Sequence, residues 1–295
     1  MSFTHRAGVT GIVPEHWAQQ MQVPLRKSMV SSVVANTRWE PTLRDGDTIH
    51  FSYYDDVSVV DYVPGQDIED HDQLTATDET LVVNQSKIAR VYVDNVEELQ
   101  TRPDQMQHLI ESATYKIADN IDTNVFLNVT GAASSLDDGD IGGNTGSAID
   151  SASGNVIDIF ASAREKMRRM NVEEVGDMVV VAPPKLIQRI EEKAADSGFS
   201  VSDATLRNGF VGNWFGFDWY VSNNLPTEEY GGTANTVNAY IGRRGMIDLV
   251  TQMTPRVIFK EVPNRLGQYM YVHTLYGTGL FEKSKHRFLA AKIAP

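Results

Sequence analysis

The residue types that most often do chemistry occur in this chain without the spacing that would bring them together. Its seven histidines are scattered, and no two stand at metal-ligand spacing on one expected element. The motifs G-x-x-x-x-G-K-[ST], G-x-G-x-x-G, H-E-x-x-H and G-x-S-x-G are missing. There is no cysteine, which excludes a thiolate nucleophile and a thiolate metal cage. We therefore predict no catalytic residue, no metal and no cofactor, and hence no enzyme.

The nearest approach to a metal site is an acidic loop, Asp137-Asp138-Gly139-Asp140. Its carboxylates are ligands that Ca²⁺ accepts, but their spacing fails the EF-hand pattern. The carboxylate pairs Asp55-Asp56 and Glu191-Glu192 are adjacent in sequence, which does not make them converge on a substrate. All of these groups are expected to face solvent, so the function is sought in binding or structure.

The formal net charge of −13 is unevenly distributed along the chain. Residues 46–86 contain ten acidic residues and no Lys or Arg, whereas residues 243–295 contain nine bases against three acids. This asymmetry indicates charge complementarity within or between chains, and the alternative is a solvated acidic loop beside an ordinary basic surface. No apolar run approaches the length of a membrane span, so no membrane partner is expected.

Hydrophobic periodicity predicts the elements that position these charges. Ile49, Phe51 and Tyr53 alternate with polar residues, and a second alternating run spans Ile88–Val93. The two runs are expected to pair as a long two-stranded hairpin with an acidic tip. A helix over about Pro103–Phe126 would extend about 36 Å at 1.5 Å per residue.

The rest of the chain alternates helices and strands without a regular βαβ pattern, which favours an α+β fold. A flexible connection is expected over Gly131–Gly154, followed by a helix over Asn155–Met170, a buried strand at Met178–Ala182 and a third helix ending at Gly198. Further strands are expected near Trp219–Ser222, Val237–Ile241, Arg256–Val262 and Tyr269–Leu275. The first forty residues are expected to form an arm, with a short helix that begins at Pro14. Trp17 either anchors this arm to a neighbouring subunit or packs in the chain's own core.

In this order, the arm, acidic hairpin, long helix, compact α+β unit and returning strands resemble the Hong Kong 97-type capsid fold of tailed-bacteriophage shells. The local phrases that carry the resemblance are Ile12–Trp17, Gly46–Ile49, Leu81–Lys87, Val91–Gln100, Ala118–Val125 and Gly216–Pro226. The resemblance implies residues 1–40 as N-arm, 41–95 as extended loop, 96–130 with 245–295 as peripheral domain containing a spine helix, and 131–244 as axial domain.

The function that this resemblance implies is that of a major capsid protein. Copies would form pentamers and hexamers, which close an icosahedral shell around double-stranded DNA. Implied partners are the chain itself, a separate scaffolding protein, a portal protein, an external cement protein where one exists, and packaged DNA by non-specific contact. The implied location is the virion capsid, with assembly in the bacterial cytoplasm. The alternatives are an encapsulin-type nanocompartment shell, which shares the fold, and a soluble α+β enzyme.

The candidate interface residues follow from the charge asymmetry and the implied domains. The acidic loop is expected to dock on basic groups of a neighbouring subunit's peripheral domain, while Trp17 anchors the arm. The expected negative groups are Asp55, Asp56, Asp61 and Asp67, and the expected positive groups are Lys260, Arg265, Lys283, Lys285 and Arg287. In the competing account, the acidic loop keeps the outer surface away from DNA and the bases face packaged phosphates.

Overall fold

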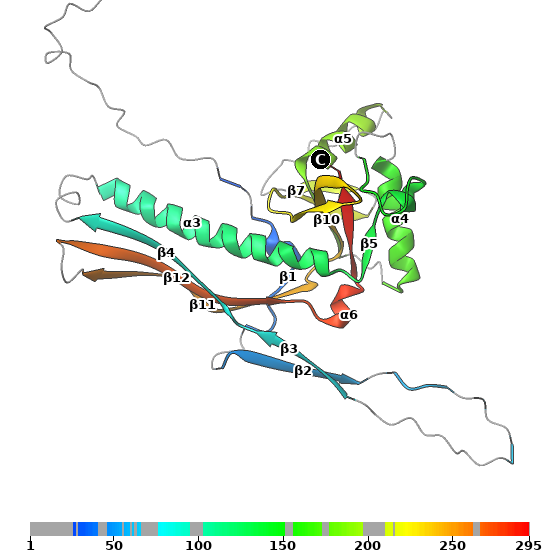
Figure 1. Ribbon diagram of the computed structural model, residues 1–295, viewed down its shortest axis with the longest axis horizontal. Helices are drawn as coiled ribbons and strands as arrows, with labels where there is room; N and C mark the ends of the chain where they lie inside the picture. The colour runs from blue at the N-terminus through cyan, green and yellow to red at the C-terminus, as the bar shows by residue number, and fades with distance from the viewer. Residues whose placement is uncertain are drawn as a thin grey trace, which may run out of the picture.

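The computed structural model consists of two sheets, a separate two-stranded ribbon and a long helix (Figure 1). It describes residues 26–27, 29–40, 46–54, 56–59, 61, 64–65, 76–94, 103–150, 156–172, 177–196, 210–214, 216–261 and 266–294. Helices and strands are mixed without βαβ alternation, which confirms the predicted α+β class. The expected helix at Pro14 and the anchor Trp17 lie outside the described residues.

The elongated half of the molecule is a four-stranded sheet under a long helix, here called the plate. Its strands lie in the order β1 (Ala35–Asn36), β11 (Ile247–Glu261), β12 (Gly267–Gly279) and β4 (Gln85–Asp94). Helix α3 (Pro103–Leu127) runs along one face. Ala113 and Ile117 of α3 pack on Met270 and Val272 of β12. The amphipathic pattern that predicts this helix therefore also identifies its buried side.

The other half, here called the core unit, is built on a seven-stranded sheet. The path of this sheet is β5 (Ser134–Leu136), β13 (Phe288–Ile293), β10 (Thr233–Arg243), β6 (Met178–Ala182), β8 (Phe217–Val221) and β7 (Phe210–Trp214), with β9 (Thr227–Tyr230) paired to β10. Helices α4 (Val156–Arg169) and α5 (Pro184–Asp196) contribute buried side chains to one cluster with this sheet. Every residue of β6 and β13 is buried, because both faces of these strands are covered.

The two faces of the core-unit sheet belong to two different clusters. Val180 and Ile241 pack with α4 and α5, whereas Val179 and Tyr240 pack on the opposite side. This second cluster also contains Phe126 from the end of α3, together with residues of β11 and β12. The plate and the core unit are therefore joined through shared apolar packing.

The ribbon projects from the junction of the two halves (Figure 1). Its strands are β2 (Thr48–Tyr54) and β3 (Ala76–Val82), which pair antiparallel. Thr48 lies opposite Val82, and Tyr54 lies opposite Ala76. The short elements are α1 (Ser31–Val34), α6 (Glu282–Lys285) and the 3-10 turns η1 (Asn128–Gly131) and η2 (Asp138–Ile141).

The expected pairing of the hairpin is wrong. The partner of β2 is β3, whereas the run Ile88–Val93 lies in β4 and pairs with β12 inside the plate. The reason is physical: alternate residues of β4, such as Ala89 and Val91, face the apolar side of α3, while the polar sequence of β3 gives little hydrophobic signal.

The predicted helices over 103–126 and 155–170 and the buried strand at 178–182 are confirmed. The predicted flexible connection over 131–154 is wrong in its first twenty residues, because Leu136 and Ile149 are fully buried and β5 pairs with β13. Strand β13 lies in the core-unit sheet. The resemblance implied that residues 245–295, which include this strand, belong with the spine helix to the peripheral domain. As a division of the chain into domains, the expected borders stay a prediction.

Candidate assembly surfaces

The charged residues expected at a subunit interface do not gather in one place. Asp56 and Asp61 are exposed on the segment that follows β2, and Lys260 is exposed near the end of β11. Lys283 and Lys285 belong to α6 at the opposite end of the plate, and exposed Arg287 follows them. Asp55, Asp67 and Arg265 lie outside the described residues. The predicted positive groups therefore form at least two separate sites.

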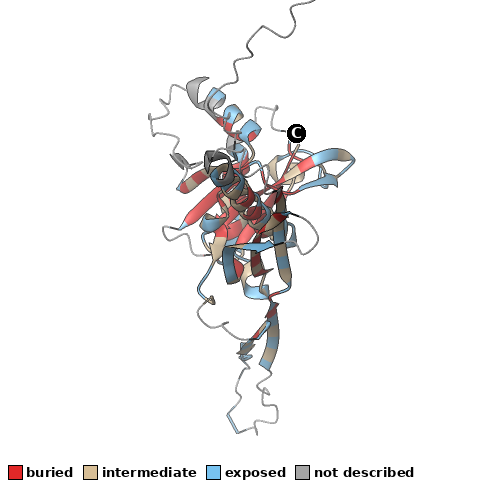
Figure 2. Cartoon of the chain, turned by 90° about the vertical axis from the view of Figure 1, so that its left-hand side faces the viewer, coloured by how far each residue is buried: buried red, intermediate tan, exposed pale blue. Residues whose placement is uncertain are grey.

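The ribbon has one covered face and one open face. Ile49 and Leu81 are buried on one face, while their neighbours His50, Thr80 and Asp78 on the other face are exposed (Figure 2). The predicted alternation of β2 is thus confirmed. No third strand pairs with the ribbon among the described residues. A two-stranded ribbon is at best marginally stable alone in water, so its open length needs packing from elsewhere.

One of the expected interface lysines lies against the covered face of the ribbon, and a second pairs within α6. Lys283 Nζ lies 4.5 Å from the centre of the Tyr53 ring, and Lys285 forms an ion pair with Glu282. This pair raises the pKa of Lys285 and lowers the pKa of Glu282, because each charge stabilises the other. The structure therefore places Lys283 against the chain's own ribbon, where sequence reasoning expected a neighbour's loop.

The face of the plate opposite α3 carries rows of aromatic and basic side chains that the sequence analysis missed. The strand register sets Lys260, Tyr269 and Tyr92 side by side in one row, and Ile258, Tyr271 and Arg90 in the next. We call these six residues the tyrosine face. Rings of Tyr92 and Tyr269 lie 5.5 Å apart, and those of Tyr269 and Tyr271 lie 5.6 Å apart.

The tyrosine face is open. A shallow depression on it is lined by Arg90, Val91, Tyr92, Tyr269 and Tyr271. Arg90 and Lys260 are exposed, so the face combines aromatic rings with positive charge. The signal that could have found it is the alternation of β12, in which Met270 and Val272 face α3 while the intervening tyrosines face away.

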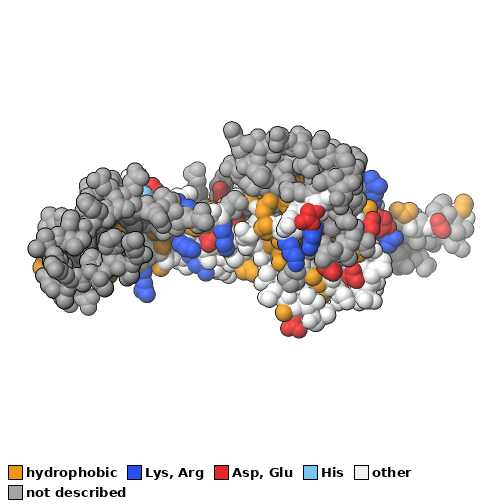
Figure 3. Space-filling model, turned by 90° about the horizontal axis from the view of Figure 1, so that it is seen from above, with side chains coloured by type: hydrophobic (Ala, Val, Ile, Leu, Met, Phe, Trp, Pro, Cys, Tyr) orange, Lys and Arg blue, Asp and Glu red, His pale blue; other side chains and the backbone are white. Residues whose placement is uncertain are grey.

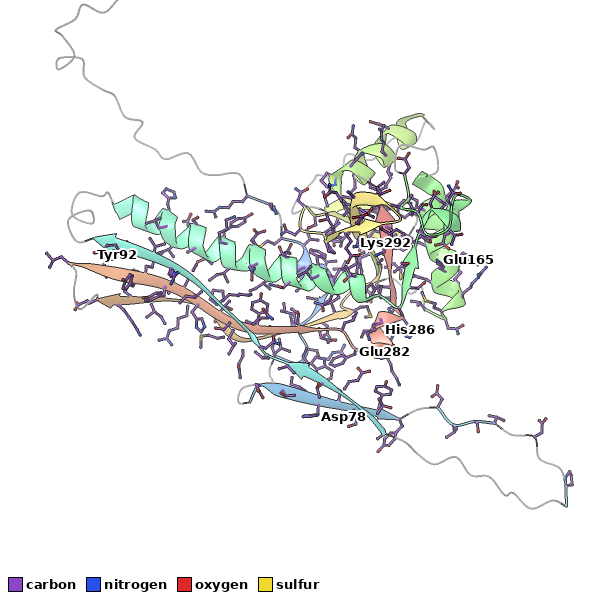
Figure 4. All side chains as sticks on the ribbon, in the orientation of Figure 1. Asp78, Tyr92, Glu165, Glu282, His286 and Lys292 are labelled. Carbon is purple, nitrogen blue, oxygen red and sulfur yellow. The ribbon has the colours of Figure 1, made fainter. Side chains whose placement is uncertain are left out.

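The tyrosine face and the ribbon lie at opposite ends of the molecule. Figure 4 shows Tyr92 near the far end of the plate, whereas Asp78 on the ribbon and Glu282 on α6 lie beyond the other end. The ribbon points away from the plate, so the open face of the ribbon does not reach the tyrosine face of its own chain. Seen from above, the α3 side carries Lys and Arg along its narrow part together with acidic groups (Figure 3).

The described part of the N-terminal segment is held on α3 by a buried carboxylate. Asp122 Oδ1 accepts hydrogen bonds from the backbone N–H groups of Val30 and Ser31 at 3.0 and 2.8 Å. Asn224 Nδ2 donates to Asp122 Oδ2 at 2.9 Å, and Lys27 Nζ donates to Asn224 Oδ1 at 2.7 Å. The expectation that an arm lies against the rest of the chain thus has a specific contact, which sequence reasoning did not identify.

A second buried carboxylate lies where β1 meets β11. Asp248 Oδ1 accepts hydrogen bonds from Asn36 Nδ2 at 2.7 Å and from Trp39 Nε1 at 3.1 Å. Burial raises the pKa of Asp248 to about 6, although these two hydrogen bonds and the charge of Arg38 lower it. Asp248 therefore changes its charge in the weakly acidic range.

The carboxylates of Asp138 and Asp140 in the acidic loop around η2 have partners within the chain. Asp138 Oδ2 accepts a hydrogen bond from the Asn144 N–H at 2.8 Å, and Asp140 pairs with Lys166. Within the described ranges, no group of three or more His, Cys, Asp or Glu side chains is placed to hold a metal ion. Among the same residues, no helix has the length and apolar character of a membrane span.

The family model of phage capsid proteins matches residues 78–290, which is well over half of the chain. A chain of Mycobacterium phage Che8 has a similar structure, with a TM-score of 0.76 and 19% identity, covering 95% of this chain and 97% of that one. The capsid of cyanophage P-SCSP1u gives a TM-score of 0.67 at 16% identity and 98% and 95% coverage, and the mature capsid of bacteriophage PhiM1 gives 0.65 at 16% identity and 96% and 92% coverage. No curated protein matches.

Proposed function

We propose a contact between copies of this chain, which belongs to the phage capsid protein family. The ribbon of one subunit joins the tyrosine face of the next. The chain is a structural major capsid protein of an icosahedral phage shell, and the encapsulin alternative is not favoured. The finer statements are proposals: pentamers and hexamers that form the shell, non-specific contact with packaged DNA, and no catalytic activity. Assembly in the host cytoplasm with a separate scaffolding protein, a portal protein and, where one exists, a cement protein is likewise proposed.

The observation that carries the proposed contact is the open face of the ribbon. A two-stranded ribbon with one open face lacks the packing that stabilises larger sheets. In a closed shell a neighbouring subunit is available to supply that packing at every position. The ribbon is therefore stable where subunits meet.

Charge selects the surface that receives the ribbon. Asp56 and Asp61 are exposed near the outer end of the ribbon, and Arg90 and Lys260 are exposed on the tyrosine face. Exposed ion pairs contribute only about 0–1 kcal/mol each, so tyrosine packing supplies contact area while charge fixes register. Because the two surfaces lie at opposite ends of one chain, the contact is head-to-tail, and such contacts generate rings when the rotation closes.

This proposal revises the expected receivers of the acidic loop. Lys260 stays a receiver, whereas Lys283 contacts Tyr53 of its own chain. Trp17, Asp55, Asp67, Arg265 and Arg287 stay candidates from the sequence. In the competing account the acidic ribbon repels DNA and does not dock, and the bases face packaged phosphates.

Charge reversal at both surfaces tests the contact. Asp56→Lys with Asp61→Lys should abolish shells in negative-stain images and leave subunits that sediment slowly. Adding Arg90→Glu and Lys260→Glu should partly restore shells, because the complementarity returns with inverted sign. The control, Asp158→Lys with Asp177→Lys, makes the same charge change at exposed positions of the core unit and should assemble normally. Normal shells from the ribbon variant would contradict docking and favour the competing account.

A further inference from the structure

The covered face of the ribbon is tied to α6 by a set of polar contacts. Both carboxylate oxygens of Glu79 accept the backbone N–H of Glu282 at 3.2 Å, at the first residue of α6. The Tyr53 hydroxyl donates to Glu79 Oε1 at 3.3 Å, and the ammonium of Lys283 lies over the Tyr53 ring. Two neighbouring strand positions therefore contact two consecutive residues of one short helix.

An apolar stack lies beside these polar contacts. The Phe51 ring lies 4.5 Å from the Trp39 ring and 4.6 Å from the Phe281 ring, in edge-to-face arrangements. Ile49 and Leu81 are buried in the same cluster with Val250 of β11. The ribbon is thus fixed by an apolar layer at its base and by Glu79, Tyr53 and Lys283 farther along its covered face.

The paired part of the ribbon has seven positions, and at about 3.3 Å each it is about 20 Å long. A rotation at its base is therefore amplified at its outer end unless the contacts at Glu79 and Tyr53 hold it. A rotation of about 10° at the root would move the outer end of such an arm by about 4 Å, which is enough to separate hydrogen-bonded or ion-paired groups. The direction of the ribbon therefore depends on a few contacts near α6.

We infer that Glu79, Tyr53 and Lys283 form a latch on α6 that sets the angle at which the ribbon leaves the subunit. They are positioning residues, which act by orienting the open face of the ribbon. The stack of Trp39, Phe51 and Phe281 holds the base of the ribbon, so the latch can open while the ribbon stays attached. The role of the latch in the shell rests on the proposed docking, whereas its effect on the angle belongs to the single subunit.

A distance measurement between two spin labels tests the latch on unassembled full-length chain. The sequence has no cysteine, so Ala76→Cys at the outer end of the ribbon and Asp158→Cys on α4, both at exposed positions, place labels uniquely. With the latch intact, the distribution of distances should be narrow. Glu79→Ala should broaden it at least two-fold, and Glu79→Gln should give an intermediate width because the amide oxygen still accepts the Glu282 N–H.

Lys283→Met is a second variant, because it keeps an apolar stem over the Tyr53 ring and removes the charge. It should broaden the distribution by less than Glu79→Ala. The control Glu192→Gln changes an exposed carboxylate that pairs with Arg189 on α5, and should leave the width unchanged. Unchanged widths in both latch variants, with normal thermal unfolding, would overturn the inference.

The consequence for the shell is tested on the same variants. Glu79→Ala should lower the yield of closed shells several-fold and raise that of open or irregular particles. Normal shells despite a broadened distribution would overturn the positioning role. This result is distinguishable from failure of the docking proposal, which shows as normal assembly of Asp56→Lys with Asp61→Lys while the latch still controls the width.

Discussion

The core-unit sheet and the ribbon are both β structure, but they differ in what covers them. Every residue of β6 and β13 is buried under helices or under the end of the plate, whereas alternate residues of β2 and β3 are exposed. The first is complete within one chain. The second is covered on one face only, so stability of the subunit and assembly of subunits depend on different parts of the molecule.

The largest expected difference between the two regions is the loss of stability when one aromatic side chain is removed from each. Phe160 is buried and lies 4.5 Å from the Trp219 ring, so Phe160→Ala should lower the free energy of unfolding by about 3–5 kcal/mol. Tyr54 is 58% exposed on the ribbon, and Tyr54→Ala should change it by less than about 0.5 kcal/mol while impairing assembly. Urea denaturation of the unassembled chain measures both, and a similar cost for the two would contradict the division.

The next most sensitive place should be the point where the ribbon leaves the plate. A Cβ added at Gly277 of β12 would lie 2.5 Å from the Val82 carbonyl oxygen and 2.9 Å from Val83 Cα, where β3 leads into β4. Gly277→Ala should therefore cost about 1–3 kcal/mol and shift the ribbon, since backbone must move. Thr278→Ala is the neighbouring control and should be near neutral. Equal denaturation midpoints for the two variants would show that the backbone at Val82 and Val83 moves aside without a loss of stability.

The stability of the contact between the described N-terminal segment and the plate should depend on pH. The carboxyl of an unfolded Asp titrates near pH 4, whereas Asp248 in the folded chain titrates near 6. The folded state therefore binds the proton more tightly, and its stability should rise as pH falls from about 7 towards 4, then level off. The gain is on the order of 1–2 kcal/mol after partial screening, with Arg38 as the charged neighbour.

Asp248→Asn separates this effect from other titrations. The amide oxygen still accepts the hydrogen bonds of Asn36 and Trp39, but it carries no charge at any pH. The variant should lose the gain between pH 7.5 and pH 5 that the parent chain shows by chemical denaturation. If both chains respond identically to pH, the buried carboxyl does not titrate in this range.

The smallest expected effect is a gain in stability inside the core unit. Asn238 on β10 is fully buried, and its side-chain oxygen and nitrogen have no hydrogen-bond partner within the described structure. A buried polar group without a partner costs about 1–3 kcal/mol, so Asn238→Leu, of similar volume, should stabilise the chain by about 1 kcal/mol. Calorimetry would detect it as a higher melting temperature. A lower melting temperature would indicate that the amide holds an internal water.

The sequence predicted the elements whose apolar residues are periodic, and it failed where pairing depends on tertiary contacts. The helix over 103–126 and the strand over 178–182 follow from local pattern, and both are confirmed. Strand β3 is polar on both faces, with Leu81 as its one buried residue, so nothing local marks it as the partner of β2. Strand β13 was missed because its buried run follows directly on a charged helix.

The candidate surfaces show the same limit. Charge counting identified Lys260 and Lys283 as bases, but it could not tell that one lies on an open face and the other on the chain's own Tyr53. The tyrosine face depends on cross-strand register between β4 and β12, which are separated by more than 170 residues. Such register is fixed by α3 packing on the other side of the sheet, and no local motif records it.

The position of β13 has a consequence for biosynthesis. Residues 288–293 lie in the sheet between β5 and β10, although the other strands of the sheet are translated long before them. The core-unit sheet therefore stays incomplete during synthesis until these residues have been translated. Pairing between strands so far apart in sequence forms slowly, so the core unit should be among the last parts of the molecule to close.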